Sequence, residues 1–304
     1  MSGKTKSAWW EKVWNPVVGC SKVSEGCRHC YAETMARRLK AMGRPEYQDV
    51  VDEGRWTEKI SMVYDRLETP EHWKKPRRIF VDSMGDLFFG GIPWEFMLRV
   101  WLMMVATPQH TYMVLTKRPD EMNTFLTMWL PYVRGLPARI KELLEKPLPN
   151  VWLGVSVEDQ KAADKRIPFL LKTPAAKRFV SYEPALGLVD FEPFLQYEPF
   201  SENYKMTFGN EEWQGLDWVI CGGESGPNAR PMHPEWARAV RDQCQAAGAP
   251  FFFKQWGEWR PTPPASDGEG IQVAPGMERC GRKAAGRLLD GREWNELPNP
   301  QPLP

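Results

Sequence analysis

The sequence predicts an α/β protein built as a full or partial (β/α) barrel, with a cysteine-rich loop directly after the first strand. Two observations predict this class: short apolar runs recur along the chain, and amphipathic stretches separate them. Continuous apolar runs are typical of strands buried on both faces of a parallel sheet. A third observation is that nearly every run ends in polar residues. In barrel enzymes the carboxyl-end rim of the strands is the active-site face.

The strand and helix positions follow from these patterns. A first strand is expected at roughly residues 11–18, just before the cysteines. Further strands are predicted at residues 77–86, 111–119, 150–159, 177–184, 217–226 and 250–257. Helices are expected at residues 93–107 and 233–248, and the second has Pro234 near its first turn and Gly248 where a helix would stop. About seven strands of this kind favour a barrel over an open doubly wound sheet.

The predicted domain organisation is one barrel domain over residues 1–260 and an extension over residues 261–304. Residues 187–216 mix aromatic and acidic side chains without a strand or helix pattern, so we expect an insertion over the rim. The extension is rich in proline and glycine. Such composition indicates a segment that packs peripherally or is partly disordered.

Composition narrows the classes of function. The 304 residues carry 40 Lys and Arg against 39 Asp and Glu, a net charge of +1, so nucleic-acid binding would need a local basic patch. No apolar run approaches the roughly 18 residues of a membrane span, and the basic N-terminus has no apolar core behind it. We therefore expect a cytoplasmic protein without membrane contact, in which clustered cysteines favour metal over disulfide.

Cys20, Cys27 and Cys30 lie within eleven residues, and the other cysteines lie far downstream. Three thiolates on one loop can hold a metal or an iron–sulfur cluster and leave one coordination position open. Gly19 and Gly26 each precede a cysteine, which would let backbone amides approach the sulfurs. The spacing favours a 4Fe–4S cluster. Zinc completed by a distant fourth residue, and three unrelated buried cysteines, are the alternatives.

With these residues in view, the chain resembles the radical S-adenosylmethionine superfamily. The resemblance covers roughly residues 9–260 and is closest to a phage and prophage branch with W-N-P-x-x-G-C near the N-terminus. That branch also shows F-V-D-S-M-G-D-L-F, L-T-K-R-P, G-V-S-V-E and C-G-G-E-S-G, all present here. The chain departs from the usual C-x-x-x-C-x-x-C pattern, since six residues separate its first two cysteines and His29 takes the place of an aromatic residue.

The resemblance implies that Cys20, Cys27 and Cys30 ligate a 4Fe–4S cluster whose fourth iron binds S-adenosylmethionine. One-electron reduction then yields a 5′-deoxyadenosyl radical that abstracts hydrogen from the substrate. It also implies an electron donor of the flavodoxin or ferredoxin type. Some phage enzymes of this kind act in thymidine hypermodification, where a glycine is moved from nitrogen to carbon attachment on the thymine methyl. The expected substrate is therefore a modified nucleotide or DNA in the host cytoplasm.

Several residues at the predicted strand tips are candidates for the remaining contacts. The resemblance suggests that the strand tip of Asp82, Ser83 and Asp86 contacts the methionine amino group, with an acidic helix cap as the alternative. Lys117 and Arg118 suit the cofactor carboxylate or a substrate phosphate, unless they are simply exposed to solvent. The remaining candidates are chosen by their positions at strand tips. Ser156 and Glu158 are expected to contact the cofactor ribose, and Glu183, Glu224 and Lys254 are expected to act in catalysis or substrate binding.

Two functions are thus in competition. The first is a radical enzyme, an isomerase or another radical catalyst acting on a modified nucleobase. The second is a nucleic-acid-binding protein that zinc or a cluster stabilises without catalysis. A cluster protein that only transfers electrons is less favoured, since those normally use four cysteines.

Overall fold

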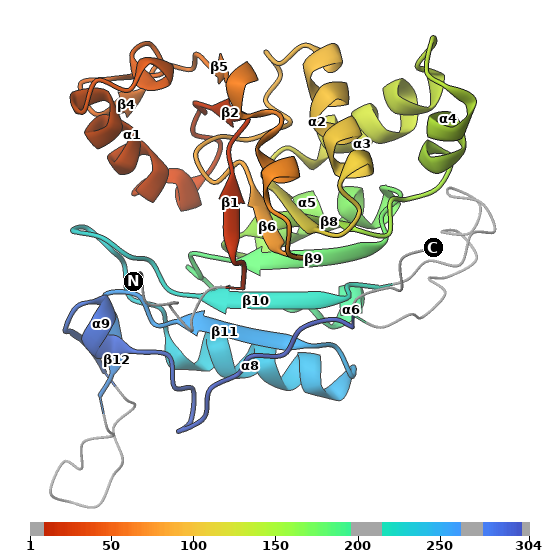
Figure 1. Cartoon of the computed structure of the whole chain (residues 1–304). Coiled ribbons are helices and arrows are strands. Elements are labelled where there is room, and N and C mark those ends of the chain that lie inside the picture. The colour runs from red at the N-terminus through yellow and green to blue at the C-terminus, as the bar shows by residue number, and fades with distance from the viewer. Residues whose placement is uncertain (1–8, 196–214, 263–275, 300–304) are drawn as a thin grey trace, which may run out of the picture.

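The computed structural model describes residues 9–195, 215–262 and 276–299. Its centre is a seven-stranded parallel sheet in the order β1-β6-β7-β8-β9-β10-β11 (Figure 1). The strands are β1 (Lys12–Trp14), β6 (Arg78–Val81), β7 (Thr111–Thr116), β8 (Val151–Val157), β9 (Lys177–Tyr182), β10 (Trp218–Gly222) and β11 (Phe251–Gln255). Since β1 and β11 are the two ends of this order, the sheet is an open, partial barrel.

The strands are apolar because both faces of the sheet are buried. In β8, Val151, Leu153 and Val155 join the large core beneath the helices, whereas Trp152 points to the opposite, inner face. The same alternation holds in the other long strands. The inner face is filled at its amino end by an aromatic cluster: Trp9, Phe80, Met113, Trp152, Phe179, Trp218, Ile220 and Phe252.

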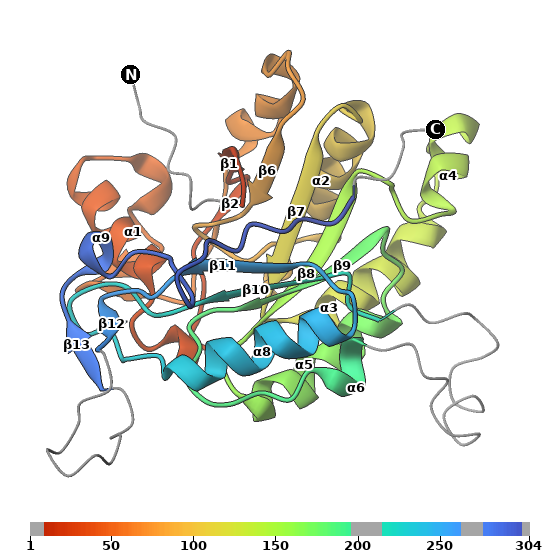
Figure 2. The same ribbon diagram turned by 90° about the horizontal axis from the view of Figure 1, so that it is seen from below.

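Helices cover the outer face. The long ones are α2 (Trp94–Ala106), α5 (Gln160–Lys172) and α8 (Pro234–Ala246), and Figure 2 shows α5 and α8 on the same side of the sheet. The shorter α3 (Pro119–Thr124) continues into a π-helical turn at Phe125–Trp129. The buried sides of all these helices share one core with the outward side chains of the strands. The connections β6–α2–β7, β7–α3–β8 and β8–α5–β9 therefore have the strand–helix–strand form expected from the sequence.

A small lobe beside β1 carries the cysteines. It contains two short antiparallel pairs, β2 (Val17–Val18) with β5 (Ser61–Met62) and β3 (Val51–Asp52) with β4 (Arg55–Trp56). The helix α1 (Tyr31–Ala41) packs on β3 through a separate cluster that includes Ala32, Ala36, Tyr47 and Val51. The remaining elements are α4 (Ala138–Leu144), α6 (Glu192–Leu195), α9 (Arg282–Ala285), β12 (Trp259–Pro261) and β13 (Met277–Arg279), with short 3₁₀ turns at Glu25–Cys27, Pro45–Tyr47, Tyr64–Arg66, Thr69–His72 and Leu130–Tyr132.

The C-terminal segment packs more closely than its composition suggests. Within residues 276–299, Leu289 and Trp294 are buried in the main core, and the Trp294 ring lies 5.9 Å from that of Phe251. Phe253 donates its backbone N–H to the Trp294 carbonyl at 3.0 Å. This part of the predicted extension is thus part of the barrel's own core. Most of the predicted insertion, residues 196–214, lies outside the described residues.

Each helix in the described ranges is too short or too polar to span a lipid bilayer.

Candidate active site at the carboxyl edge of the sheet

The cysteine loop, residues 19–30, runs from β2 to α1 beside the tips of β6 and β7. Its first residue, Gly19, has a φ of +101° and donates its N–H to the carbonyl of Met84 at 3.0 Å. A side chain at Gly19 would collide with the Lys59 carbonyl, since its Cβ would lie 2.4 Å from that oxygen. Glycine is therefore required here by close backbone approach and by the left-handed conformation. The loop begins fixed against the strand that carries Asp82 and Asp86.

The three thiols of this loop lie near enough to influence one another. Burial raises the pKa of Cys20 to about 11, with Asp86 and Cys30 acting in the same direction. Burial also raises the pKa of Cys30, and the charge of Cys27 adds to that effect. The pKa of Cys27 is lowered: burial opposes ionisation, but Lys117 and the nearby backbone amides outweigh it. The pKa of each of these three thiols thus depends on charged neighbours as well as on burial.

Lys117 and Arg118, at the tip of β7, point at these thiols. Lys117 Nζ lies 3.5 Å from Cys27 Sγ, and Arg118 Nη1 lies 3.7 Å from Cys20 Sγ. Arg118 also donates to the Ser21 hydroxyl at 2.8 Å. The two cations therefore contact the cysteine loop itself. From the sequence, Lys117 was expected to bind a cofactor carboxylate or a substrate phosphate, or to be exposed to solvent.

Asp86 holds the tip of β7 in this position. Its Oδ1 accepts from the Thr116 hydroxyl at 2.7 Å and from the Phe88 N–H at 3.1 Å. Its Oδ2 accepts from Arg118 Nη1 at 2.9 Å and from the Lys117 N–H at 3.2 Å. With four donors and only 7% of its side chain exposed, Asp86 is satisfied by the protein alone. Its geometry is that of a support for the Lys117–Arg118 turn.

Asp82, four residues before Asp86, has fewer hydrogen-bond partners than Asp86. The residue is 3% exposed and adopts a left-handed φ of 55°. Its Oδ1 accepts from the Val17 N–H at 3.0 Å, but Oδ2 has no hydrogen-bond partner among the described residues. Burial, with a smaller contribution from Asp86, raises the pKa of Asp82 well above its usual range. A buried carboxyl oxygen without a hydrogen-bond partner is costly to keep ionised, which agrees with this raised pKa.

Ser83 lies at the same tip and faces the neighbouring elements. Its hydroxyl donates to Asn15 Oδ1 at 3.2 Å, and its carbonyl accepts from the Tyr31 hydroxyl at 2.8 Å. These bonds join the tip of β6 to the residue after β1 and to the first residue of α1. Ser83 therefore helps to place the helix that follows Cys30.

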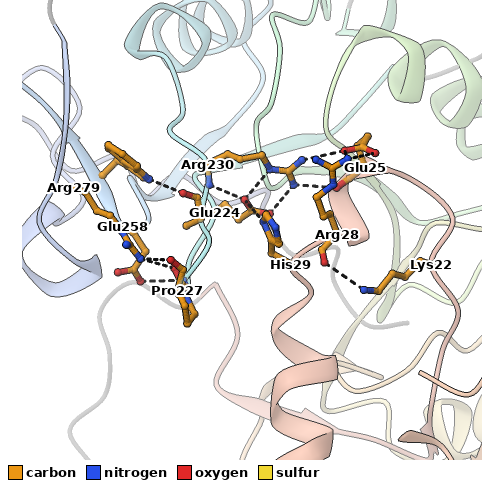
Figure 3. Close-up of polar contacts among 12 residues, drawn as sticks. Lys22, Glu25, Arg28, His29, Glu224, Pro227, Arg230, Glu258 and Arg279 are labelled. Carbon is orange, nitrogen blue, oxygen red and sulfur yellow. Dashed lines mark hydrogen bonds and ion pairs between the residues drawn. The ribbon is translucent and has the colours of Figure 1, made fainter. Parts of the chain in front are cut away.

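Glu224 and Arg230 attach the loop after β10 to the cysteine loop. Figure 3 shows Arg230 and His29 converging on the Glu224 carboxylate. Arg230 donates to Glu224 Oε1 at 2.7 Å and to the Glu25 carbonyl at 3.0 Å, and His29 Nδ1 lies 3.3 Å from Glu224 Oε2. Burial opposes ionisation of Glu224, but its hydrogen bonds with Arg230 and His29 lower its pKa. We name residues 223–230 the rim loop.

Glu258 and Arg279 hold the rim loop from its other side. Glu258 Oε1 accepts from the Gly226 N–H at 3.1 Å, and Arg279 donates to the Pro227 carbonyl (Figure 3). From the sequence, Glu224 is a positional candidate for catalysis or substrate binding. In the structure its carboxylate accepts hydrogen bonds from Arg230 and lies against His29, so it joins the rim loop to the cysteine loop.

Glu158 forms an interior ion pair beneath the cysteine loop. Arg166 of α5 donates to Glu158 Oε2 at 2.8 Å, and both side chains are at most 5% exposed. Burial opposes ionisation of Glu158, yet Lys117 and Arg166 lower its pKa. A Cβ on Gly26 would lie 3.1 Å from Glu158 Oε2 and 3.2 Å from Lys117 Nζ. The glycine thus lets the loop pack directly on this pair.

Glu183, Lys254 and Ser156 lie on the other half of the rim. Lys254 Nζ is 3.0 Å from Glu183 Oε1, and Ser181 donates to Glu183 Oε2 at 3.0 Å. The ammonium also lies 5.3 Å above the Trp10 ring. Ser156 and Ser181 are paired across β8 and β9, on the strand face that carries Trp152 and Phe179 lower down. The inner face is therefore aromatic at its amino end and polar towards the carboxyl edge.

The predicted positions thus divide into three groups. The loop itself carries Cys20, Cys27 and Cys30, and Lys117, Glu158 and Glu224 lie against it. Asp82, Ser83 and Asp86 lie at the neighbouring tip of β6, where Asp86 holds the Lys117–Arg118 turn. Ser156, Glu183 and Lys254 line the inner face. Sequence reasoning gave no role to Arg166 or Arg230, because the partners of both arginines are set by tertiary contacts. It also gave no role to Trp10, because no local pattern places that ring under Lys254.

The described side chains give a partial test of the metal alternatives. No three His, Cys, Asp or Glu side chains within the described ranges are gathered tightly enough to hold one metal ion. A single zinc ion with Zn–S bonds of about 2.3 Å needs its sulfurs within about 4 Å of one another. A four-iron cluster makes a different demand, because each thiolate binds its own iron atom. Two of the three thiols face a lysine or an arginine, and Asp82 Oδ2 lies without a hydrogen-bond partner at the neighbouring strand tip.

Comparison with known proteins places the chain in a family without assigning it an activity. Residues 4–298 match the model of DUF5131, described as a protein of unknown function, and the chain belongs to that family. Neither a curated protein nor a solved structure matches the chain.

Proposed function

We propose that this protein is a radical S-adenosylmethionine enzyme that binds a 4Fe–4S cluster through Cys20, Cys27 and Cys30. One observation carries the proposal: three thiols share one loop at the carboxyl edge of a parallel sheet, and two of them face a lysine and an arginine. Lys117 helps to lower the pKa of Cys27 and so favours its thiolate, the form that binds iron, whereas burial raises the pKa of Cys20 and Cys30. The carboxyl edge is also where α/β barrels bind their ligands.

The bound cluster would supply one electron to the sulfonium of S-adenosylmethionine, giving methionine and a 5′-deoxyadenosyl radical. The chain's own part is to bind and orient. The free Oδ2 of Asp82 would accept a hydrogen bond from the methionine ammonium, and this contact would stabilise the ionised carboxylate. Lys117 remains with the thiolates in this proposal, since its ammonium is already directed at Cys27. A ferredoxin or flavodoxin would provide the electron.

The polar part of the inner face is the proposed substrate site. Ser156, Glu183 and Lys254 lie there, and the Trp10 ring beneath Lys254 offers an apolar surface to a flat base. A modified nucleobase or nucleotide suits this combination of one acid, one base and an aromatic ring. The specific reaction we propose is conversion of glycine-modified thymidine from the nitrogen-linked to the carbon-linked form in phage DNA.

Anaerobic reconstitution tests the cluster. The protein is purified without oxygen and supplied with iron and sulfide. Its iron and sulfide contents and its visible absorption then show whether a 4Fe–4S cluster has formed. Dithionite and S-adenosylmethionine are then added and 5′-deoxyadenosine is measured. We expect wild type to form the cluster and release 5′-deoxyadenosine.

Matched cysteine variants make this test specific. Cys27→Ala should lose both the cluster and 5′-deoxyadenosine, whereas Cys280→Ala should keep both, since no described contact joins Cys280 to the cysteine loop. Absence of iron–sulfide uptake in wild type would overturn the proposal. One zinc per chain, with nucleic-acid binding that weakens steeply with salt, would support the non-catalytic alternative. Mass spectrometry of nucleosides from phage DNA made with and without the gene tests the thymidine reaction separately.

A further inference from the structure

Each thiol of the cysteine loop has its own source of positive potential. Arg118 faces Cys20 at 3.7 Å, and Lys117 faces Cys27 at 3.5 Å. Cys30 is the N-cap residue of α1, an eleven-residue helix, so it lies at the positive end of the helix dipole. Lys117 also acts on Cys30, so two side-chain cations and one helix end lie near the three sulfurs.

The two cations are held by contacts that do not involve cysteine. Arg118 bonds Asp86 at 2.9 Å and the Ser21 hydroxyl at 2.8 Å, and its guanidinium lies 4.8 Å from the Phe89 ring centre. The Lys117 backbone N–H is fixed by Asp86 Oδ2 at 3.2 Å. The Lys117 ammonium is then enclosed, because a Cβ on Gly26 would lie 3.2 Å from it. The cations are therefore in place before any ligand arrives.

The nearby acids do not cancel this charge. Asp86 is saturated by four donors, one of which is Arg118. Glu158 is the other acid near Lys117, and Arg166 pairs with it at 2.8 Å. The three cations Lys117, Arg118 and Arg166 carry three positive charges, and Asp86 and Glu158 carry two negative charges. One net positive charge therefore remains beside the sulfurs.

We propose that Lys117 and Arg118 are tuning residues, which raise the reduction potential of the cluster by compensating the charge of its thiolate ligands. The inference rests on the proposed function, since it needs a cluster on Cys20, Cys27 and Cys30. Reduction adds one negative charge to a site that is already anionic. A cation about 4 Å from a ligand sulfur, partly shielded from water, lowers the free-energy cost of that added charge.

The test is a redox titration of the reconstituted full-length protein, followed by the electron paramagnetic resonance signal of the reduced cluster. Lys117→Gln and Arg118→Gln each remove one charge. At a fixed solution potential we expect each to raise the ratio of oxidised to reduced cluster about tenfold, which is about 59 mV for a one-electron couple. The double variant should shift further in the same direction. The readout is the potential, so it does not depend on turnover.

Charge-preserving and remote variants complete the design. Lys117→Arg and Arg118→Lys should keep the wild-type potential, and so should Lys161→Gln and Arg139→Gln, which alter exposed residues of α5 and α4. A wild type that takes up no iron and sulfide overturns the proposed function. A loaded wild type with unchanged potentials in both glutamine variants overturns this inference alone. An equal shift in Lys117→Gln and Lys117→Arg also overturns it, because the cause would then be packing rather than charge.

Discussion

Arg230 binds Glu224 through two nitrogens, with Nε 2.9 Å from Oε2 and Nη2 2.7 Å from Oε1. The same Nη2 donates to the backbone carbonyl of Glu25, 205 residues away along the chain. The rim loop and the cysteine loop therefore depend on one guanidinium. Because Glu224 is nearly buried, that guanidinium both neutralises an interior charge and positions the segment between Cys20 and Cys27.

Replacing this arginine should loosen the cysteine loop. Arg230→Gln leaves the buried Glu224 carboxylate with fewer donors, so we expect the free energy of unfolding to fall by about 2–3 kcal/mol. The free energy of unfolding of Arg230→Lys should lie between those of wild type and Arg230→Gln, since a lysine keeps the charge but cannot bind with two nitrogens. Urea unfolding measures the stability, and the rate of iron release to a chelator measures retention of the cluster. Arg260→Gln, which breaks a surface pair with Glu278, is the control and should behave as wild type. Wild-type iron release from Arg230→Gln would contradict the joining role of Arg230.

Asp86 should be among the most sensitive polar positions of the site. Asp86→Asn turns an amide donor towards groups that themselves donate, Arg118 and the Lys117 N–H. We expect a loss of about 3–5 kcal/mol in the free energy of unfolding, because Arg118 would keep a largely buried charge without its partner. Denaturant titration gives this value. Asp120→Asn, in the exposed first turn of α3, provides the comparison and should cost about 0.3–1 kcal/mol. A loss no larger than that in Asp86→Asn would show that the carboxylate is not the support described here.

The buried carboxyl group of Asp82, whose Oδ2 has no partner among the described residues, predicts a definite dependence of stability on pH. Its pKa is higher in the folded state than the value of about 3.9 in an unfolded chain, so the folded state binds the proton more tightly. This contribution to stability is full below the unfolded pKa and is lost as the pH rises towards the folded pKa. Asp82→Asn has no carboxyl group to ionise, so it does not lose this stability as the pH rises. The stability of Asp82→Asn relative to wild type should therefore increase between about pH 4 and about pH 8. Urea titrations across this range measure the difference, and a difference that is constant or decreases with pH would argue against a buried, ligand-free carboxyl.

Glu183 and Lys254 should be coupled in stability. Their side chains are 13% and 24% exposed and lie 3.0 Å apart, so solvent screens the pair only in part. A double-mutant cycle with Glu183→Gln and Lys254→Met should give a coupling of about 1 kcal/mol. Thermal or urea unfolding of the four proteins measures it. A coupling near zero would mean that the two groups act independently and that their pairing does not define the polar end of the inner face.

The strands could be predicted because both of their faces are buried, and α2 and α8 could be predicted because each has one apolar side, but α5 (Gln160–Lys172) was not predicted. The run predicted at 150–159 is observed as β8 (Val151–Val157), and the helix predicted at 93–107 is α2 (Trp94–Ala106). The first strand was only partly predicted. Residues 11–18 divide at Pro16, which has no N–H to give to a sheet. As a result β1 ends at Trp14, and Val17–Val18 pairs with β5 instead.

The partners of the rim residues could not be read from the sequence. Asp82 and Asp86 stand four residues apart at one strand tip, and the sequence treats them alike. Only the fold brings Thr116, Lys117 and Arg118 to Asp86 while leaving an Asp82 oxygen alone. Glu224 is another case, since its interaction with His29 spans 195 residues. Polarity at a strand tip predicts that a residue lies at the edge, but tertiary contacts decide whether it supports the protein or receives a ligand.

The position of Trp9 has a consequence for how the chain reaches its native state. This ring lies 5.8 Å from Trp218 and 5.7 Å from Phe179, so its contacts join the start of the described chain to strands near its other end. Contacts of such long sequence separation form late, because a large loop must close before they contribute. Trp9 also contacts Phe80, so its packing begins earlier, but that packing is complete only when β9 and β10 have been made. Completion of the aromatic cluster around Trp9 therefore marks the closing step of assembly.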